Sequence, residues 1–129
     1  MLLHRLTTDL YGCNAEVCSA SVVEQTLQNA LEAAEFKILG RTLVNFQPHG
    51  ATAVFVLAES HAVISTWPEV LFASLDLALC AKAERGESVI EAMNKLLMPK
   101  SIVTKRSISQ PDFQLNKTPE QDADMRNVR

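Results

Sequence analysis

The stretch ATAVFVLAESHAVISTWPEVLFASLDLALC, residues 51–80, carries the strongest structural signal in this chain. It contains two strongly apolar runs, residues 53–58 and 62–64, of the kind found in buried strands. Three consecutive polar side chains, Glu59, Ser60 and His61, separate the two runs. Burying these groups without partners would cost roughly several kcal/mol. Either the chain turns here and the triplet reaches water, or the triplet occupies a polar site that performs chemistry.

The segments around this stretch predict further strands and two helices. Strands are expected over residues 3–10, 37–46 with a bulge at Gly40, from 51 onward, 71–80 and 101–109. Each helix is predicted from a capping-box pattern, Ser21-x-x-Glu24 or Ser88-x-x-Glu91, followed by apolar residues at helical spacing. The first helix should end near Phe36 and the second at Pro99.

This order of elements predicts an α+β fold, a two-layer sandwich. Because most of the expected strands are neighbours in sequence, the sheet should be mainly antiparallel, with both helices packed on one face. The other face then needs a cover, which a second copy of the chain would supply in a homodimer.

Length and composition indicate one soluble, cytoplasmic domain. Residues 1–109 are expected to form it, and residues 110–129 are polar and Pro-containing, which is typical of a mobile tail. The net charge of −3, without a dense Lys/Arg patch, argues against nucleic acid, and no apolar run approaches a membrane span. The chain shows no secretory signal, and the spacing of its three cysteines, Cys13, Cys18 and Cys80, matches no zinc-binding pattern. Neither disulfides nor a metal site is therefore expected.

A set of motifs nevertheless points to one family. These motifs are Glu59-Ser60-His61, Thr66-Trp67-Pro68-Glu69, Cys80 twenty residues after Ser60, Asp9-Leu10-Tyr11-Gly12-Cys13-Asn14, and Phe46-x-Pro48-x-Gly50. Together they resemble the S-adenosylmethionine decarboxylase family in its short bacterial and archaeal form. Any one of these motifs alone would be weak, whereas the set is specific.

The resemblance implies a proenzyme that cleaves its own chain. In that family the serine attacks the carbonyl before it, which here places the cut between Glu59 and Ser60. Residues 1–59 would form the β chain, and residues 60–129 the α chain, headed by a pyruvoyl group made from Ser60. This cofactor forms a Schiff base with the substrate amine and takes up the electrons released with CO₂, as pyridoxal phosphate does elsewhere. The product would be the aminopropyl donor for spermidine biosynthesis.

The resemblance also implies roles for residues outside the triplet. Cys80 matches the cysteine that reprotonates the substrate carbon, and Thr52 matches a hydroxyl that assists the rearrangement. The substrate-binding positions are Phe46, Trp67 and Glu69, the two rings near adenine and the carboxylate on the ribose hydroxyls. Without the motif set, each of these residues would be explained by strand packing or as a solvated charge.

One position departs from the family pattern. Ser65 stands where the family has a histidine that assists proton removal during processing, and a hydroxyl is a much poorer base than an imidazole. Processing could then be slow, the proton could be carried by His61 or water, or the pocket could be changed for another substrate. A pyruvoyl-dependent L-ornithine or L-arginine decarboxylase and an unprocessed, non-catalytic paralogue therefore stay as alternatives.

Overall fold

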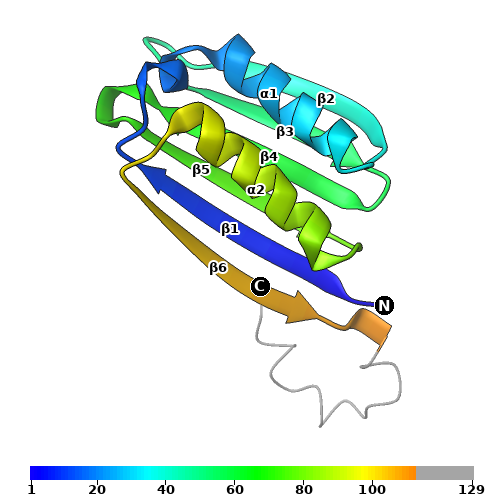
Figure 1. Ribbon diagram of the computed structural model, residues 1–129. Coiled ribbons are helices and arrows are strands. Elements are labelled where there is room, and N and C mark those ends of the chain that lie inside the picture. Colours follow the sequence, from blue (N-terminus) through cyan, green and yellow to red (C-terminus); the bar gives the residue numbers. More distant parts are fainter. Residues whose placement is uncertain (113–129) are drawn as a thin grey trace, which may run out of the picture.

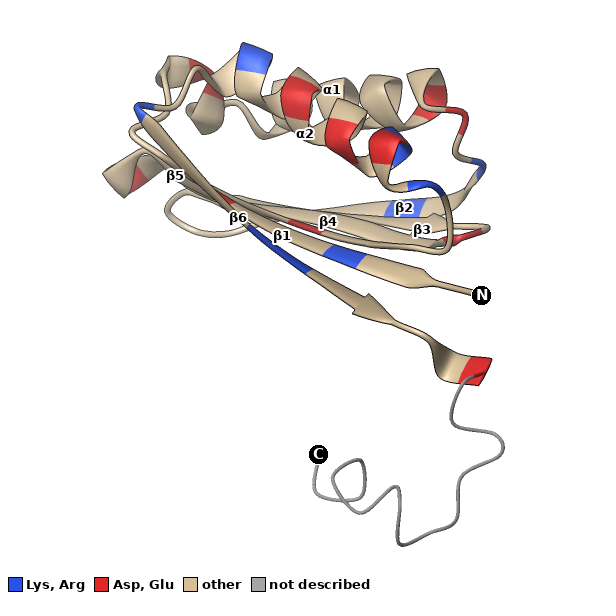
Figure 2. Cartoon of the chain, turned by 60° about the horizontal axis from the view of Figure 1, so that its bottom comes forward, with Lys and Arg blue, Asp and Glu red and all other residues tan. Residues whose placement is uncertain are grey.

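The computed structural model describes residues 1–112, so residues 113–129 of the predicted tail lie outside the described part. Six strands form one antiparallel sheet in the order β2-β3-β4-β5-β1-β6, and two α-helices lie on one of its faces (Figures 1 and 2). The elements are β1 (Leu3–Tyr11), η1 (Ala15–Cys18), α1 (Ala20–Ala33), β2 (Ile38–Asn45), β3 (Ala51–Leu57), β4 (Ser60–Trp67), η2 (Pro68–Val70), β5 (Phe72–Leu79), α2 (Ala83–Leu97) and β6 (Ser101–Ser109). The predicted α+β sandwich in two layers is confirmed.

The stretch of residues 51–80 forms the centre of the sheet. Strands β3 and β4 are joined by a two-residue turn, with Leu57 paired to Ser60, and β5 pairs with β4 on the other side. Side chains alternate along each strand, so Ala53 and Phe55 are buried under the helices while Thr52 points to the opposite face. Of the two alternatives for the polar triplet, the structure shows the turn, at residues 58–59.

The core lies between the sheet and the apolar stripes of the helices. The fully buried helix residues are Val23, Leu27 and Leu31 of α1, and Val89, Met93 and Leu97 of α2. Gly86 of α2 lies so close to the sheet that an added Cβ would meet Leu6 Cδ1 at 2.6 Å. The first turn of α2 therefore rests directly on the strands.

Both predicted helix starts are wrong. Helix α1 begins at Ala20 after Ser19, and α2 begins at Ala83 after Lys82. Ser88 lies inside α2, where its hydroxyl donates to the Arg85 carbonyl at 2.8 Å. The capping pattern is a local signal, whereas packing of Gly86 against the sheet extends α2 upstream of that serine.

The strand predictions hold more closely. The expected strands at residues 37–46 and 71–80 correspond to β2 and β5, and the pairing of β2 with β3 shifts between Ile38 and Gly40, as the predicted bulge requires. Trp67, before Pro68, adopts the non-helical φ of −126° and ψ of 80°, as the proline predicts.

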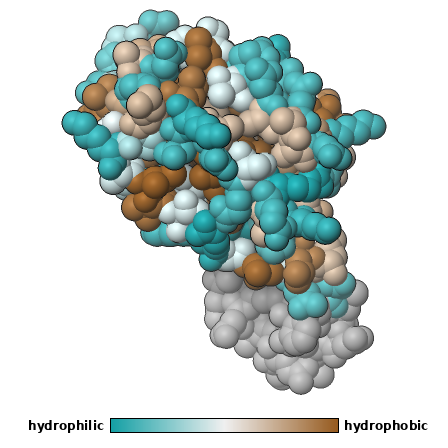
Figure 3. All heavy atoms as spheres, in the orientation of Figure 1, coloured by the Kyte–Doolittle hydropathy of each residue, from teal (hydrophilic) through white to brown (hydrophobic). Residues whose placement is uncertain are grey.

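The face of the sheet opposite the helices is called the open face below. It carries the side chains that alternate with the buried ones, including Thr52, Ser65, Trp67, Phe72 and Tyr11. Neither α-helix covers it (Figure 2). The side of the molecule that carries the helices faces the viewer in Figure 3, and its surface mixes hydrophilic and hydrophobic residues. No helix within residues 1–112 is long and apolar enough to cross a membrane.

Candidate active site

The turn between β3 and β4 holds Ser60 in a strained backbone conformation. Ser60 is the first residue of β4 and has a φ of 129°, a value that residues with a side chain rarely adopt. Such a conformation costs about 1–3 kcal/mol and persists only where neighbouring structure enforces it. Pairing of Ser60 with Leu57 and with Leu79 supplies that enforcement.

The carbonyl before Ser60 is held by one backbone donor. The N–H of Cys80 donates to the Glu59 carbonyl oxygen at 2.9 Å, and the turn is also tied by the N–H of Ala58 to the Lys37 carbonyl at 2.9 Å. A donor aimed at a carbonyl oxygen stabilises the negative charge that forms there when the carbon is attacked. The peptide bond between Glu59 and Ser60 is therefore polarised, and the residue that follows it is strained.

The Ser60 hydroxyl lies next to an imidazole. Ser60 Oγ is 3.2 Å from Nδ1 of His61, the following residue, whose side chain is exposed. In the tautomer with a free Nδ1, this nitrogen can accept the hydroxyl proton and so activate the oxygen as a nucleophile. The hairpin thus contains a nucleophile, a base and a polarised carbonyl.

The thiol of Cys80 is accessible beside the same turn. Cys80 directly follows β5 and is exposed, whereas Cys13 is buried and its Sγ–H donates to the Leu10 carbonyl at 3.4 Å. Burial raises the pKa of the Cys13 thiol, which keeps that residue protonated and inert. Of these two cysteines, only Cys80 can exchange a proton with a bound molecule near Ser60.

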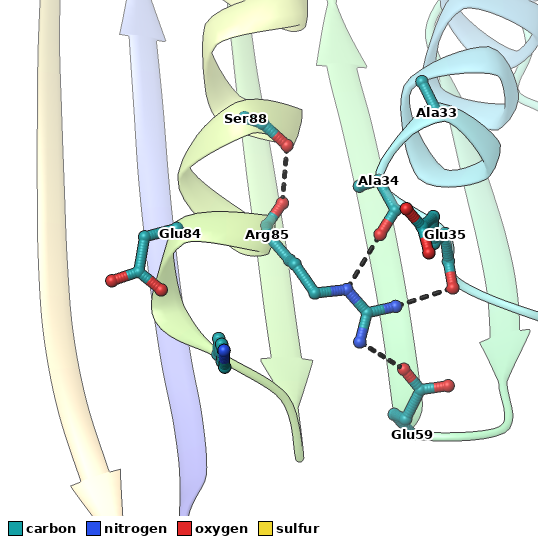
Figure 4. Close-up of a pocket in the computed structure, with 8 residues that line it drawn as sticks. Ala33, Ala34, Glu35, Glu59, Glu84, Arg85 and Ser88 are labelled. Atoms are coloured by element: carbon teal, nitrogen blue, oxygen red, sulfur yellow. Dashed lines mark hydrogen bonds and ion pairs between the residues drawn. The ribbon is translucent and has the colours of Figure 1, made fainter.

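The Glu59 side chain also has a partner. Its carboxylate oxygen Oε2 lies 3.1 Å from Nη1 of Arg85, at the edge of a surface pocket between the two helices and the hairpin (Figure 4). Sequence reasoning missed Arg85. No pattern signals it, because its partners lie about 25 and 50 residues away along the chain.

Thr52 and Ser65 form a second group of predicted site residues, on the open face. Their hydroxyl oxygens are 2.7 Å apart across the β3–β4 pair. In the same row across the sheet, Ser74 donates to Asp9 Oδ1 at 3.0 Å. Ser65 is five residues from Ser60 on one strand, about 16 Å at roughly 3.3 Å per residue. A side chain at position 65 cannot reach the Ser60 hydroxyl of its own chain.

The predicted substrate-binding residues lie at the far end of β4. Trp67 and Phe46 are 42% and 48% exposed, and the Trp67 ring packs at a tilt of 45° against Phe72, with centroids 5.3 Å apart. Glu69 Oε2 pairs with His49 Nε2 at 3.3 Å. Trp67 is seven residues from Ser60, about 23 Å along an extended strand. One chain therefore brings together Glu59, Ser60 and Cys80, but it does not bring Phe46, Trp67 and Glu69 to them.

A metal centre is not formed by the described residues. Within residues 1–112, no group of three or more His, Cys, Asp or Glu side chains is placed to hold a metal ion.

Comparison with known proteins gives one consistent result. The model of the S-adenosylmethionine decarboxylase family matches residues 4–109. The S-adenosylmethionine decarboxylase proenzyme of Sulfurihydrogenibium sp. is 39% identical over 101 residues, 78% of this chain and 75% of the relative. The proenzyme of that name from Aquifex aeolicus is 36% identical over 101 residues, 78% and 74% of the two chains.

Solved structures agree with this match. The crystal structure of the adenosylmethionine decarboxylase from Aquifex aeolicus aligns with a TM-score of 0.76 at 31% identity, covering 82% of this chain and 88% of that chain. The AdoMetDC-delta26 monomer of Trypanosoma brucei aligns with a TM-score of 0.60 at 14% identity, over 78% and 44% of the two chains. The second similarity concerns the fold alone.

Proposed function

This chain belongs to the S-adenosylmethionine decarboxylase family, whose enzymes are pyruvoyl-dependent, and we propose that Ser60 is the residue that becomes its pyruvoyl group. The activity is decarboxylation of S-adenosylmethionine, the reaction that makes the aminopropyl donor for spermidine biosynthesis. The backbone geometry at Ser60 carries this assignment. Ser60 has a φ of 129°, and the carbonyl before it accepts the Cys80 N–H at 2.9 Å.

Self-cleavage at this bond proceeds through an ester. Ser60 Oγ attacks the Glu59 carbonyl carbon, and the bond from that carbon to the Ser60 nitrogen breaks. The hydroxyl proton ends on this nitrogen, which becomes a free amine on Ser60. Removal of the Ser60 α-proton then expels the Glu59 carboxylate, so Glu59 becomes a chain end and Ser60 becomes dehydroalanine. Water adds to the imine tautomer and ammonia leaves, which gives the pyruvoyl group. The Cys80 N–H stabilises the charge that develops on the Glu59 oxygen.

His61 is the proton acceptor for the first step. The family uses a histidine at the position of Ser65, and Ser65 is already hydrogen-bonded to Thr52. The Ser60 hydroxyl instead meets the His61 imidazole at 3.2 Å. An imidazole in that position supplies the base that a serine hydroxyl cannot.

The products of cleavage would stay assembled as one domain, residues 1–109, made of a β chain (1–59) and an α chain (60–129). The cut falls at the turn end of the hairpin, so the pairs between β3 and β4 from Val56–His61 to Ala51–Thr66 survive, and β4 keeps its pairing with β5 from His61 onward. The surroundings of Ser60 fit a pyruvoyl group, because that position is partly exposed and the accessible Cys80 follows the strand paired with it.

The pyruvoyl group supplies the electron sink for loss of CO₂. The residues of the chain bind the substrate and move protons. Cys80 delivers the proton to the substrate carbon, since its thiol is accessible beside Ser60. Phe46 and Trp67 present exposed rings on which adenine can stack, and the Glu69 carboxylate can accept hydrogen bonds from the ribose hydroxyls.

Two copies of the chain are needed to complete such a site. Trp67 lies about 23 Å from Ser60 and Ser65 about 16 Å from it along the same strand, which is too far for one small substrate to touch both ends. In a homodimer with antiparallel strands across the open faces, the Ser60 end of one chain meets the Trp67 end of its partner. The uncovered sheet face and its aromatic row support this pairing.

A cytoplasmic location stays a prediction. Its support is that Cys13, Cys18 and Cys80 are all free thiols, as expected in a reducing compartment.

Release of labelled CO₂ from S-adenosylmethionine, L-ornithine and L-arginine tests the proposed activity. The purified protein should decarboxylate S-adenosylmethionine, and Ser60→Ala should be inactive on all three compounds. Activity only on ornithine or arginine would replace the proposed substrate while keeping the chemistry. Absence of activity on all three would favour the non-catalytic paralogue.

A further inference from the structure

Arg85 joins three segments that are far apart in the sequence. Its guanidinium contacts Glu59 Oε2 through Nη1 at 3.1 Å, and it donates to the Ala34 carbonyl through Nε at 2.8 Å and to the Glu35 carbonyl through Nη2 at 2.6 Å. Figure 4 shows the side chain reaching from α2 to the end of α1 and to the hairpin. Each nitrogen of the guanidinium therefore has a different partner.

The environment of Arg85 fixes this geometry. The guanidinium carbon lies 4.1 Å from the centroid of the Phe36 ring, so the group is stacked as well as hydrogen-bonded. The Arg85 and Glu59 side chains are only 32% and 26% exposed. Gly86 brings the first turn of α2 down onto Leu6 and Leu79, next to the end of β5. A pair held in this way is screened by water less than an ion pair on the surface.

Glu59 is consequently held at both of its functional groups. Its carbonyl oxygen accepts the Cys80 N–H, and its carboxylate is paired with Arg85. The turn around it has only two residues, and the Arg85 contact adds a side-chain restraint on the peptide bond before Ser60 to the restraints from strand pairing and the Cys80 N–H. Rotation of that peptide would take the carbonyl off its donor and would release the strained φ of Ser60.

From this arrangement we infer that Arg85 is a positioning residue for self-cleavage, which holds Glu59 so that its carbonyl stays on the Cys80 N–H in front of the Ser60 hydroxyl. The inference rests on the proposed function, because it concerns the rate of the same cleavage. Arg85 touches no reacting atom and acts through the Glu59 carboxylate.

The test follows cleavage of newly synthesised full-length chain over time by intact mass. Arg85→Met should slow cleavage roughly tenfold to a hundredfold, because a charge-assisted contact is lost. Arg85→Lys, which keeps the charge and loses the fork of donors, should fall between Arg85→Met and wild type. A matched control is Arg106→Met. It removes the two contacts, at 2.7 and 3.0 Å, between Arg106 of β6 and the carboxylate of Glu87, which like Arg85 lies on α2. This control should cleave like wild type.

A double variant separates positioning from general destabilisation. If Arg85 acts through the Glu59 carboxylate, Arg85→Met should add little further slowing once Glu59→Gln is present. Thermal unfolding of each variant in a Ser60→Ala background, which does not cleave, reports folding independently of cleavage. If Arg85→Met fails to fold there, the comparison of Arg85→Lys with wild type carries the test.

Several results would overturn the inference. Wild-type cleavage rates in both Arg85 variants would do so while leaving the proposed function intact, because the wild-type chain would still be cleaved. Equal slowing by Arg106→Met, or fully additive effects of Arg85→Met and Glu59→Gln, would reduce Arg85 to a structural residue. An unbroken wild-type chain would instead remove the proposed function itself.

Discussion

The two ends of strand β4 are built in different ways. At the Ser60 end, a two-residue turn holds a strained residue, a fixed carbonyl and a paired carboxylate. At the Trp67 end, large rings are exposed, the Trp67 ring packs at a tilt against Phe72, and His49 Nε2 lies 3.3 Å from Glu69 Oε2, each of these two side chains being about half exposed. The first end is suited to breaking a backbone bond, and the second to binding a flat, polar molecule.

Under the proposed function, this difference means that one chain alone would not form a complete site. The reactive end and the binding end are separated by the length of the strand, about 23 Å. A reaction that needs both must combine the reactive end of one chain with the binding end of another. Four experiments test this contrast between the two ends of β4, the first with the largest expected effect and the last with the smallest.

The largest effect is expected from separating the two ends in mixed dimers. A Ser60→Ala dimer should be inactive, and a Trp67→Ala dimer should be nearly inactive at low substrate concentration. A dimer of one chain of each kind, purified through two different tags, should recover about half of the wild-type activity, because one of its two sites is intact. Mixed dimers that form but stay inactive would contradict the composite site.

Cys80 separates the two reactions at the Ser60 end. Cys80→Ala removes the thiol but keeps the backbone N–H that binds the Glu59 carbonyl, so cleavage should proceed within a few-fold of the wild-type rate. Decarboxylation should fall by roughly 10²- to 10⁴-fold, the usual loss when a general acid is removed. Both rates can be measured on one preparation, by intact mass and by CO₂ release.

The control for the thiol is Cys18→Ala, since Cys18 is also exposed but lies in η1. It should change neither rate. If Cys80→Ala blocked cleavage as strongly as decarboxylation, the thiol rather than the backbone donor would be needed for processing.

Removal of the Trp67 ring should affect binding without affecting cleavage. Trp67→Ala should raise KM for S-adenosylmethionine by roughly tenfold to a hundredfold, because stacking of a base on an aromatic ring contributes about 1–3 kcal/mol. The rate of self-cleavage should be unchanged. Steady-state kinetics of the processed enzyme gives the first quantity, and Val70→Ala, at an exposed neighbouring residue, is the control. Slowed cleavage with an unaltered KM would reverse the assignment of the two ends.

The smallest of the four effects concerns the base. His61→Asn should slow cleavage about tenfold or more, because the imidazole next to the Ser60 hydroxyl is lost. Ser65→His in the His61→Asn background should restore part of the rate only in the proposed dimer, where position 65 of the partner subunit would lie near Ser60, because position 65 of the same chain is about 16 Å away. His4→Asn on β1 serves as the control. Cleavage of His61→Asn at the wild-type rate would exclude His61 as the proton acceptor.

Much of this fold could be predicted from apolar runs and turn chemistry. The apolar run of β3 followed by the polar triplet indicates the central hairpin. Gly40 signalled the bulge, and Pro68 ended the extended segment. The helix starts were missed because Ser21 and Ser88 satisfy a local capping rule, while close packing around Gly86 determines where α2 begins.

The site was predictable as a set of residue types but not as an arrangement. The motif around Ser60 predicted which bond would be cut and gave Cys80 a role in the reaction, and the structure places Cys80 next to the turn. The sequence could not show that Thr52, Ser65 and Trp67 lie away from Ser60, since that follows from their places along an extended strand. Nor could it reveal Arg85, whose partners meet only after the helices pack on the sheet.

The most direct test of the central claim is the intact mass of the purified, folded protein. Cleavage between Glu59 and Ser60 predicts two fragments, residues 1–59 and residues 60–129, with the second lighter by one ammonia than a fragment that begins with serine. That fragment should also react with hydroxylamine through its new carbonyl. A single unbroken chain after long incubation, with no reactive carbonyl, would contradict the account.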